Sequence, residues 1–220
     1  MGTLKIGRWV LGRLSTNTYF VYRENGEEVI VIDPADYGEK IYSTLKEQGL
    51  RVAAILLTHG HFDHIWGVEA LKEAANAAAE ENGLDAVKVY ACEAERELLQ
   101  DALKNVSADF HRPCTVQADQ YLADGEELRI GDITCKVIAT PGHTEGGCCF
   151  YFEEEGFLIS GDTLFEESVG RTDFPTGSMG VLVRSIREKL FELPDDTKVY
   201  PGHGEATTIG HEKKYNPFCV

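Results

Sequence analysis

The sequence predicts an α+β protein with a four-layer αββα sandwich architecture, in which two β-sheets pack face to face and helices cover their outer sides. A stretch rich in short apolar strands is followed by helical segments, and this succession occurs twice along the chain. Because each sheet must bury one face, two such halves are expected to pack sheet against sheet. The 220 residues contain no low-complexity segment and no Pro- or Ser-rich linker. We therefore expect a single domain over residues 1–220.

The first half carries short apolar runs separated by turns, and one of these runs is apolar throughout, as in a strand buried on both faces. Two helices are expected among these strands: an amphipathic one that Gly49 ends, and an Ala- and Glu-rich one over Val68–Glu81. Residues 93–103 predict a further helix, and residues 105–117 predict an irregular excursion or flap. The expected strands of this half cover residues 18–22, 29–33, 52–57 and 87–90.

In the second half, the pattern from Gln120 onward is that of β-strands separated by Gly-containing turns. A helix over residues 179–191, a strand over residues 198–200 and a short helix before Asn216 complete the chain. The expected strands of the β-rich part cover residues 127–130, 133–139, 148–152 and 157–160.

The chain is strongly acidic, with 21 Lys and Arg against 37 Asp and Glu and a formal charge of −16 at pH 7. Such a surface repels phosphate backbones, so nucleic acid is not an expected partner. The first residues lack the basic and apolar regions of a secretory leader, and no apolar run approaches the roughly 18 residues of a membrane span. We expect a soluble cytoplasmic protein that takes a small-molecule substrate, without a membrane or an obligate protein partner.

The six cysteines include no CxxC pair, and the only close couple is the adjacent Cys148 and Cys149. This spacing indicates neither a disulfide framework nor a thiolate zinc site. We expect small, buried thiols in a reducing compartment.

Histidines are concentrated in three short segments, each of which follows a predicted apolar strand. Because binding loops sit at the ends of rigid strands, we expect the three segments to converge on one end of the sheets. These segments hold five of the seven histidines, namely His59, His61, His64, His143 and His203.

The spacing in the first segment predicts a loop that wraps a cation. Its candidate ligands stand at relative positions 0, 2, 4 and 5, which match neither the helix period nor the strand period. Imidazole and carboxylate together suit zinc, iron or manganese, and the lack of thiolates argues against a closed structural zinc site. The pattern therefore predicts an open, catalytic metal site.

Five motifs in order resemble those of the metallo-β-lactamase superfamily, and within it the glyoxalase II-like (hydroxyacylglutathione hydrolase-like) branch. The motifs are Thr58–His64, Pro141–Thr144, Ser160–Thr163, Gly170–Pro175 and Pro201–Gly204. The resemblance covers essentially the whole chain and implies two mixed β-sheets flanked by helices. It corresponds to a short form without the C-terminal helical region of full-length glyoxalase II enzymes.

The resemblance also implies a two-metal site, with zinc as the first expectation and iron or manganese as alternatives. A metal-bridging hydroxide would hydrolyse a thioester such as S-lactoylglutathione or a related acyl-thiol. Asp63 is expected to orient this hydroxide in addition to binding metal. By the resemblance, one metal ion takes His59, His61 and His143, the second takes Asp63, His64 and His203, and Asp162 bridges the two.

Further residues are expected around the metals. Thr58 and Asp33 are candidates for holding a ligand imidazole in its required tautomer, although Asp33 followed by Pro34 also fits a plain turn after a strand. Arg171, Asp173 and Phe165 are expected to bind substrate. A solvated ion pair between Arg171 and Asp173 is the alternative for those two.

Other functions of the same fold stay open at this point. A persulfide dioxygenase of this branch would bind one iron through His59, His143 and Asp162, and a lactone or other ester hydrolase of the same fold is a further alternative. Thr163–Glu167 stands where glyoxalase II enzymes carry a basic and aromatic glutathione-binding segment. The acidic charge disfavours a nuclease, and an open two-metal site disfavours a protein without catalytic activity.

Overall fold

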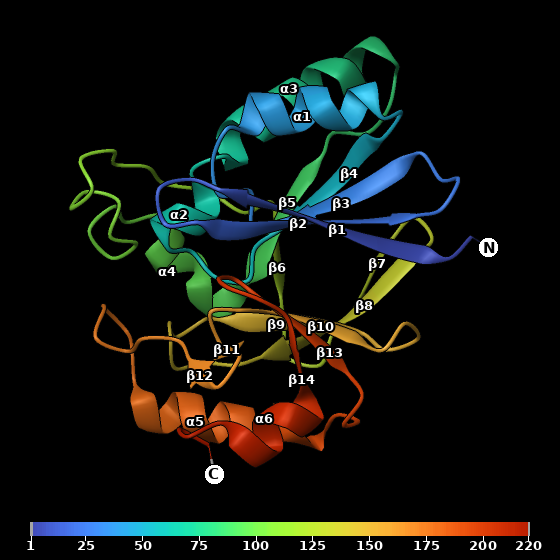
Figure 1. Ribbon diagram of the computed structural model, residues 1–220. Helices are drawn as coiled ribbons and strands as arrows, with labels where there is room; N and C mark the ends of the chain where they lie inside the picture. The colour runs from blue at the N-terminus through green and yellow to red at the C-terminus, as the bar shows by residue number, and fades with distance from the viewer. Residues whose placement is uncertain (1, 220) are drawn as a thin grey trace.

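The computed structural model describes residues 2–219, and it has the predicted αββα architecture (Figure 1). The first sheet has the strand order β1-β2-β3-β4-β5-β6, and the second has the order β14-β13-β10-β9-β8-β7. Both sheets are mixed, because β3 pairs in parallel with β4 and β10 with β13, while β1 with β2 and β8 with β9 are antiparallel. The strands of the first sheet are β1 (Leu4–Leu11), β2 (Thr16–Arg23), β3 (Glu28–Ile32), β4 (Arg51–Leu56), β5 (Lys88–Cys92) and β6 (Gln120–Leu122).

The second sheet comes from the C-terminal half of the chain, drawn from yellow to red in Figure 1. Its strands are β7 (Glu127–Ile130), β8 (Ile133–Ala139), β9 (Cys148–Phe152), β10 (Phe157–Gly161), β13 (Lys198–Pro201) and β14 (Thr207–Thr208). A separate two-stranded ribbon, β11 (Leu164–Phe165) and β12 (Ser168–Val169), follows β10.

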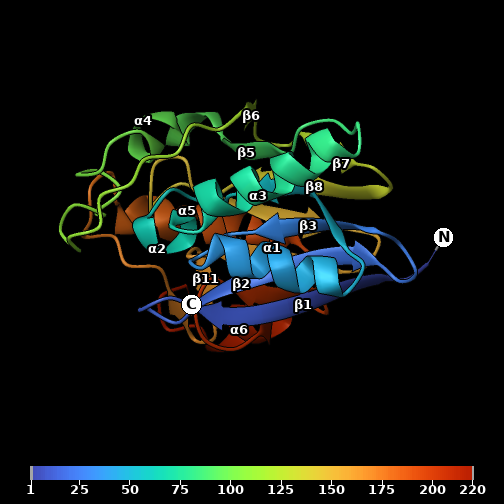
Figure 2. The ribbon, with the colours of Figure 1, turned by 90° about the horizontal axis from the view of Figure 1, so that it is seen from above.

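Helices cover the outer face of each sheet. The first sheet carries α1 (Gly38–Glu47) and α3 (Val68–Glu81), which lie side by side in both views, and the second carries α5 (Met179–Glu188) and α6 (Ile209–Tyr215) (Figures 1 and 2). The short helices α2 (Phe62–Ile65) and α4 (Arg96–Leu99) lie at one end of the sandwich. Short 3-10 turns at Glu93–Glu95 and Leu190–Glu192 complete the helical segments.

The strands of the first sheet are apolar on both sides because both faces are buried. In β2, Tyr19 and Val21 face the core between the sheets, whereas Phe20 belongs to the core beneath the helices. A third cluster lies between the second sheet and its helices, around Leu182 and Ile186 of α5. This double burial explains why β4 is the nearly continuous apolar run that the sequence predicts.

One strand was not predicted, and one predicted helix is shorter than expected. Residues 4–11 form an edge strand, which sequence reasoning missed because charged residues interrupt its apolar ones. The helix expected over residues 93–103 ends after Leu99, whose carbonyl accepts from the backbone N–H of Val116. Asp101 Oδ1 then accepts from the N–H groups of Leu103 and Lys104, at 2.8 and 3.3 Å. This side chain therefore starts a turn that competes with the helix.

Within residues 2–219, no helix combines the length and the apolar character needed to cross a lipid bilayer. The six cysteines are unpaired, and all but Cys114 are buried, as the sequence predicts.

Candidate metal centre

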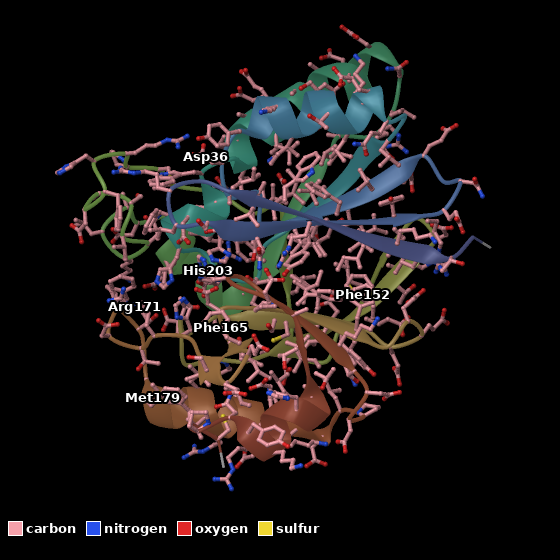
Figure 3. The ribbon with its side chains drawn as sticks, in the orientation of Figure 1. Asp36, Phe152, Phe165, Arg171, Met179 and His203 are labelled. Carbon is pink, nitrogen blue, oxygen red and sulfur yellow. The ribbon has the colours of Figure 1, made fainter. Side chains whose placement is uncertain are left out.

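The candidate ligands lie on loops that meet at one end of the sandwich, between the two sheets. Backbone hydrogen bonds join these loops: Cys148 N donates to Thr58 O at 2.8 Å, and Asn17 N donates to Gly202 O at 2.7 Å. In Figure 3 the labelled His203 lies at this end, with Phe165 and Arg171 beside it. The rigid strands thus bring together side chains from distant parts of the sequence.

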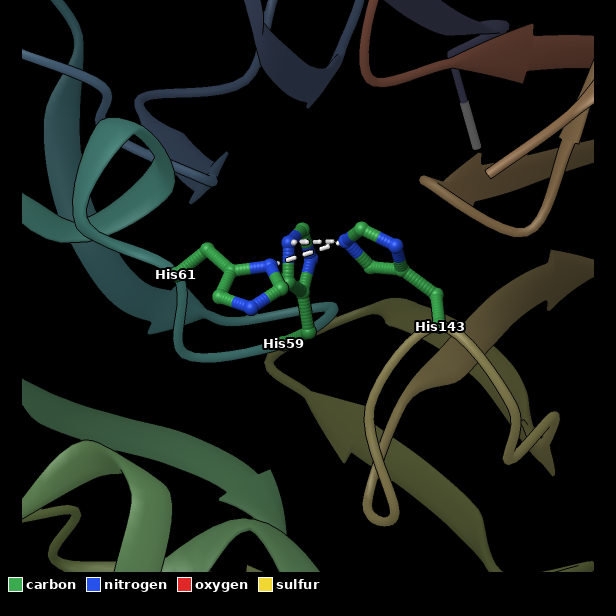
Figure 4. Close-up of side chains that lie close together, drawn as sticks. All are labelled: His59, His61 and His143. Carbon is green, nitrogen blue, oxygen red and sulfur yellow. Dashed lines mark hydrogen bonds between the residues drawn. The ribbon is translucent and has the colours of Figure 1, made fainter. Parts of the chain in front are cut away.

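Three imidazoles form the first ligand group, which consists of His59, His61 and His143 (Figure 4). The Nε2 atom of His143 lies 2.8 Å from His61 Nδ1 and 3.2 Å from His59 Nε2. Burial lowers the pKa of His61 to about 3 and, with repulsion from neighbouring imidazoles, holds the pKa of His59 well below its usual value. These rings are therefore neutral at pH 7, as metal binding requires.

The second ligand group combines Asp63, His64 and His203. Asp63 Oδ2 lies 3.3 Å from His203 Nε2 and 3.7 Å from His64 Nε2. Burial alone would lower the pKa of His203, but the carboxylates of Asp162 and Asp63 raise it to about 9. A bound cation would take the place of that proton.

Asp162 lies between the two groups. Its Oδ2 atom is 3.6 Å from His143 Nε2 in the first group and 3.5 Å from His203 Nε2 in the second. Its Oδ1 atom is 3.4 Å from His64 Nε2. Asp162 thus approaches donor atoms of both groups.

The donor atoms fit a pair of divalent cations. Among the described residues, His64 Nε2 and Asp162 Oδ1 are buried without a hydrogen-bond partner, which is rare for buried polar atoms. Tetrahedral zinc with bonds of about 2.0–2.1 Å places neighbouring ligand atoms about 3.3 Å apart. The spacings of 3.3 to 3.5 Å around His203, Asp63 and Asp162 match this value.

Buried hydrogen bonds set the orientation of the ligand rings. Asp33 accepts from His64 Nδ1 at 2.9 Å and from Thr58 N and Oγ1 at 2.8 and 2.6 Å. Thr58 Oγ1 in turn accepts from His59 Nδ1 at 3.1 Å. Both rings consequently present Nε2 to the centre. Both oxygens of Asp33 are engaged in these bonds, which assigns it to the support of the ligand rings. Donor atoms of Asp33, His59 and His64 also lie within 4.8 Å of one another, so this carboxylate is close enough to be a further candidate ligand.

His143 is held from the other side of the cavity. Its Nδ1 donates to the backbone carbonyl of Arg171 at 2.7 Å, which leaves Nε2 free to face the first group. The motif Gly170–Pro175 therefore supports a ligand through its backbone, in addition to any role of its side chains.

Sequence reasoning missed two supporting residues. The fully buried Glu95 accepts from Gly60 N at 2.8 Å and from Thr144 Oγ1 at 3.0 Å, so it links the loops of the first ligand group. Burial raises the pKa of Glu95 to about 7. Thr16 Oγ1 donates to Asp63 Oδ2 at 2.8 Å. No local signal indicated either residue, because Glu95 stands in a polar, helix-like stretch and Thr16 begins a strand.

Gly202 allows the closest approach of the backbone to the centre. A Cβ atom at this position would collide with Asp162 Oδ1 and would lie 2.7 Å from His64 Cε1. The glycine is therefore required by space, not by an unusual backbone conformation.

A cavity of about 490 Å³ opens above the two ligand groups, which is within the usual size range of small-molecule sites. Phe165 lines this cavity, and its ring centroid lies 6.3 Å from that of His203. Arg171 also lines it, whereas Asp173 does not. Instead, Asp173 accepts from Arg171 Nε and Nη2, both at 2.7 Å. Of the three predicted substrate-binding residues, two therefore face the cavity.

The family model described as the metallo-beta-lactamase superfamily matches residues 11–203. The chain belongs to this superfamily.

Two relatives support a hydrolytic role. The probable metallo-hydrolase YqgX of Bacillus subtilis is 36% identical over 217 residues, covering 98% of this chain and 97% of the relative. Hydroxyacylglutathione hydrolase GloC of Haemophilus influenzae is 33% identical over 201 residues, covering 89% of each chain. The protein is a metal-dependent hydrolase with a dinuclear His/Asp site.

Solved structures show the same fold. BLEG-1, described as a B3 metallo-beta-lactamase, has a TM-score of 0.85 and 37% identity, covering 98% of this chain and 100% of its own. TTHA1623, described in a di-iron-bound form, has a TM-score of 0.80 and 36% identity, covering 96% of this chain and 99% of its own. Iron is therefore a metal that a relative of this chain binds.

Proposed function

We propose that this protein hydrolyses thioesters in the manner of the glyoxalase II-like branch, with zinc as the native metal. The observation that carries the proposal is the pair of ligand groups that share Asp162 beneath an open cavity. The name of the Haemophilus influenzae relative, a hydroxyacylglutathione hydrolase, supports a thioester substrate.

In this proposal each ligand group holds one divalent cation. When bound, such cations lower the pKa of water toward neutrality and polarise a substrate carbonyl. A departing thiolate has a conjugate acid with a pKa of about 8–9, so a thioester needs little general-acid assistance. The ligands are His59, His61 and His143 for one cation, Asp63, His64 and His203 for the other, and Asp162 for both.

Asp63 is the proposed catalytic residue. It lines the cavity, where its carboxylate can orient the attacking water and accept a proton from it. Burial would raise its pKa, but His64 and His203 lower it, so the carboxylate stays ionised at neutral pH. Thr16 fixes its orientation by donating to Oδ2.

Substitution Asp63→Asn tests this role. We expect hydrolysis to fall by at least about 100-fold, the usual value of a positioned acid or base, while metal content measured by mass spectrometry stays at the wild-type level. Asp109→Asn, which changes an exposed aspartate of the excursion, is the matched control. If turnover falls only in proportion to lost metal, Asp63 acts as a ligand alone.

A persulfide dioxygenase with a single iron is the second candidate. The residues that it would use lie together, because His143 Nε2 is 3.2 Å from His59 Nε2 and 3.6 Å from Asp162 Oδ2. The complete second group, with its unpartnered His64 Nε2, favours two metals instead.

Anaerobic purification with metal analysis, followed by parallel assays, separates the candidates. The assays are hydrolysis of S-lactoylglutathione, of simple thioesters and of lactones, and oxygen uptake on a persulfide. We expect thioester turnover with two metals per chain. One iron per chain together with oxygen consumption on the persulfide would refute the proposal, and lactone turnover without thioester turnover would redirect it to esters.

A further inference from the structure

Aromatic side chains flank the metal centre on both sides. The ring of Phe174 lies 5.5 Å from that of His61 in the first ligand group, whereas the ring of Phe165 lies 6.3 Å from that of His203 in the second. A substrate whose reactive bond lies over the metal centre would therefore contact apolar surface on both sides of that bond.

The apolar residues that line the cavity form two walls. The first wall consists of Phe110 and Phe174. Phe110 comes from the excursion over residues 105–117, and its ring stacks on that of Phe62 with centroids 4.1 Å apart. The second wall consists of Leu14, Phe165 and Val169. Val169 and Phe165 come from the ribbon β11–β12, and Leu14 precedes Thr16, which bridges to His203.

Apart from the two proposed metal ions on its floor, this cavity has few cationic groups. Among the described residues that line it, Arg171 is the only lysine or arginine. Its guanidinium donates twice to Asp173 and lies 3.8 Å from the ring centroid of Phe174. Beyond the second wall, the turn between β11 and β12 carries two exposed carboxylates, Glu166 and Glu167, and Glu167 Oε1 lies 3.1 Å from His211 Nε2. Away from the metal ions, a ligand with several carboxylates would find one partly neutralised cation, Arg171, and an acidic turn beyond the second wall.

We propose that the substrate is a thioester that is apolar on both sides of its C–S bond and carries at most one anionic group, placed at Arg171. This inference rests on the proposed thioester hydrolysis and narrows it. Glutathione brings two carboxylates and an ammonium group, which the walls would desolvate without partners, so it is not the preferred thiol. In the reaction, water oxygen bonds to the acyl carbon and the C–S bond breaks. The sulfur leaves with the electron pair and a proton, giving one carboxylic acid and one thiol.

A panel of thioesters tests the inference. Acetyl, butyryl and hexanoyl groups are each joined to N-acetylcysteamine and to glutathione, and kcat/KM is measured together with that for S-lactoylglutathione. We expect kcat/KM to rise at least about tenfold from acetyl to hexanoyl on either thiol, since each buried methylene contributes severalfold. Glutathione should give no gain over N-acetylcysteamine with the same acyl group.

Variants and a binding measurement locate the effect. Phe165→Ala and Phe174→Ala should each reduce the dependence on acyl length, and Phe165→Leu should restore much of it. Phe218→Ala, at a half-exposed aromatic that does not line the cavity, should keep the wild-type dependence. Calorimetry with non-hydrolysable thioethers should show S-hexyl-N-acetylcysteamine binding more tightly than S-methylglutathione.

The outcomes distinguish the two proposals. A kcat/KM that is independent of acyl length, or one that is highest for glutathione thioesters, overturns this inference and leaves thioester hydrolysis intact. Absence of turnover on every thioester, with both metals bound, overturns the proposed function and this inference with it.

Discussion

The floor and the mouth of the cavity are built in different ways. The floor consists of the two ligand groups and the buried residues that hold them, such as Asp33 and His64, which are 1% and 0% exposed. The mouth consists of the two apolar walls and Arg171, and includes side chains as open as Leu14, which is 44% exposed. On the floor, Asp33, Thr58 and the backbone of Arg171 each hold a ligand ring by a hydrogen bond.

This difference separates chemistry from specificity. A change on the floor leaves a buried polar atom without its partner, which costs both stability and metal affinity. A change at the mouth alters contact area around a substrate and leaves the floor intact. The following predictions test whether the two regions are as independent as the contacts indicate.

Loss of the shared carboxylate should have the largest effect. Because removal of a supporting partner costs about 10- to 100-fold in metal affinity or activity, removal of Asp162, the proposed ligand to both cations, should exceed that range. We expect Asp162→Ala to reduce metal content below two per chain and to reduce hydrolysis by more than about 100-fold. Mass spectrometry of metal content and thioester turnover measure both. Full metal content would show that Asp162 does not ligate.

Asp33 should come next. In Asp33→Asn, an NH2 group takes the place of one of the oxygens that accept from Thr58 or His64. We therefore expect metal affinity to fall by about 10- to 100-fold. Competition with a chelator measures the affinity. Asp124→Asn, at a carboxylate that accepts from Ala139 N and Lys189 Nζ and bonds neither to a candidate ligand nor to Asp33 or Thr58, should leave the affinity unchanged. Equal losses in both variants would contradict a specific role of Asp33.

Glu95 offers a comparison between two buried carboxylates. Glu212 is also fully buried, and it accepts from the hydroxyl of Thr207 and from the backbone N–H of Glu167. In contrast to Glu95, it contacts no ligand loop. We expect Glu95→Gln to weaken metal binding about fivefold, which is less than the loss of a direct partner. Glu212→Gln should leave metal affinity at the wild-type level, even if it lowers stability. Equal metal affinities of the two variants would contradict a link through Glu95.

The stability of Glu95→Gln relative to wild type should depend on pH. The folded-state pKa of Glu95 is raised from 4.5 to about 7, so folding favours its protonated form. Its contribution to stability is fully present below pH 4.5 and is lost as the pH rises through 7. The difference in unfolding free energy between wild type and Glu95→Gln should therefore fall by roughly 3 kcal/mol from pH 4.5 to 8. Denaturant unfolding at several pH values measures it, and a constant difference would contradict the raised pKa.

Arg171→Ala should have the smallest effect. The Arg171–Asp173 pair is exposed, so its loss should not measurably change the unfolding midpoint. Metal content should also stay unchanged, because His143 donates to the backbone of Arg171 and not to its side chain. KM for a thioester with one carboxylate should rise about three- to fivefold. A loss of metal would show that floor and mouth are coupled.

Features with a local sequence pattern could be predicted, and features that depend on contacts between distant segments could not. The fold class was predictable because alternating strands and helices have strong local patterns, and the candidate ligands were predictable because they share short motifs after apolar strands. Edge strand β1 was not, since its mixed composition lacks a clear period.

Partners that come from distant segments could not be predicted from local patterns. Glu95 and Thr16 meet the ligand loops only in the folded chain. The same holds at the mouth, where Phe165 and Arg171 were expected from motifs, whereas Phe110 and Leu14 were not. Nothing in their local sequence shows that these side chains face one cavity.

The most direct test of the two-metal account is a metal titration of the apoprotein, followed by both calorimetry and thioester turnover. The account predicts that binding saturates at two zinc ions per chain and that hydrolysis reaches its maximum with the second. Saturation at one equivalent of metal, with activity complete at that point, would contradict a shared role of the two ligand groups.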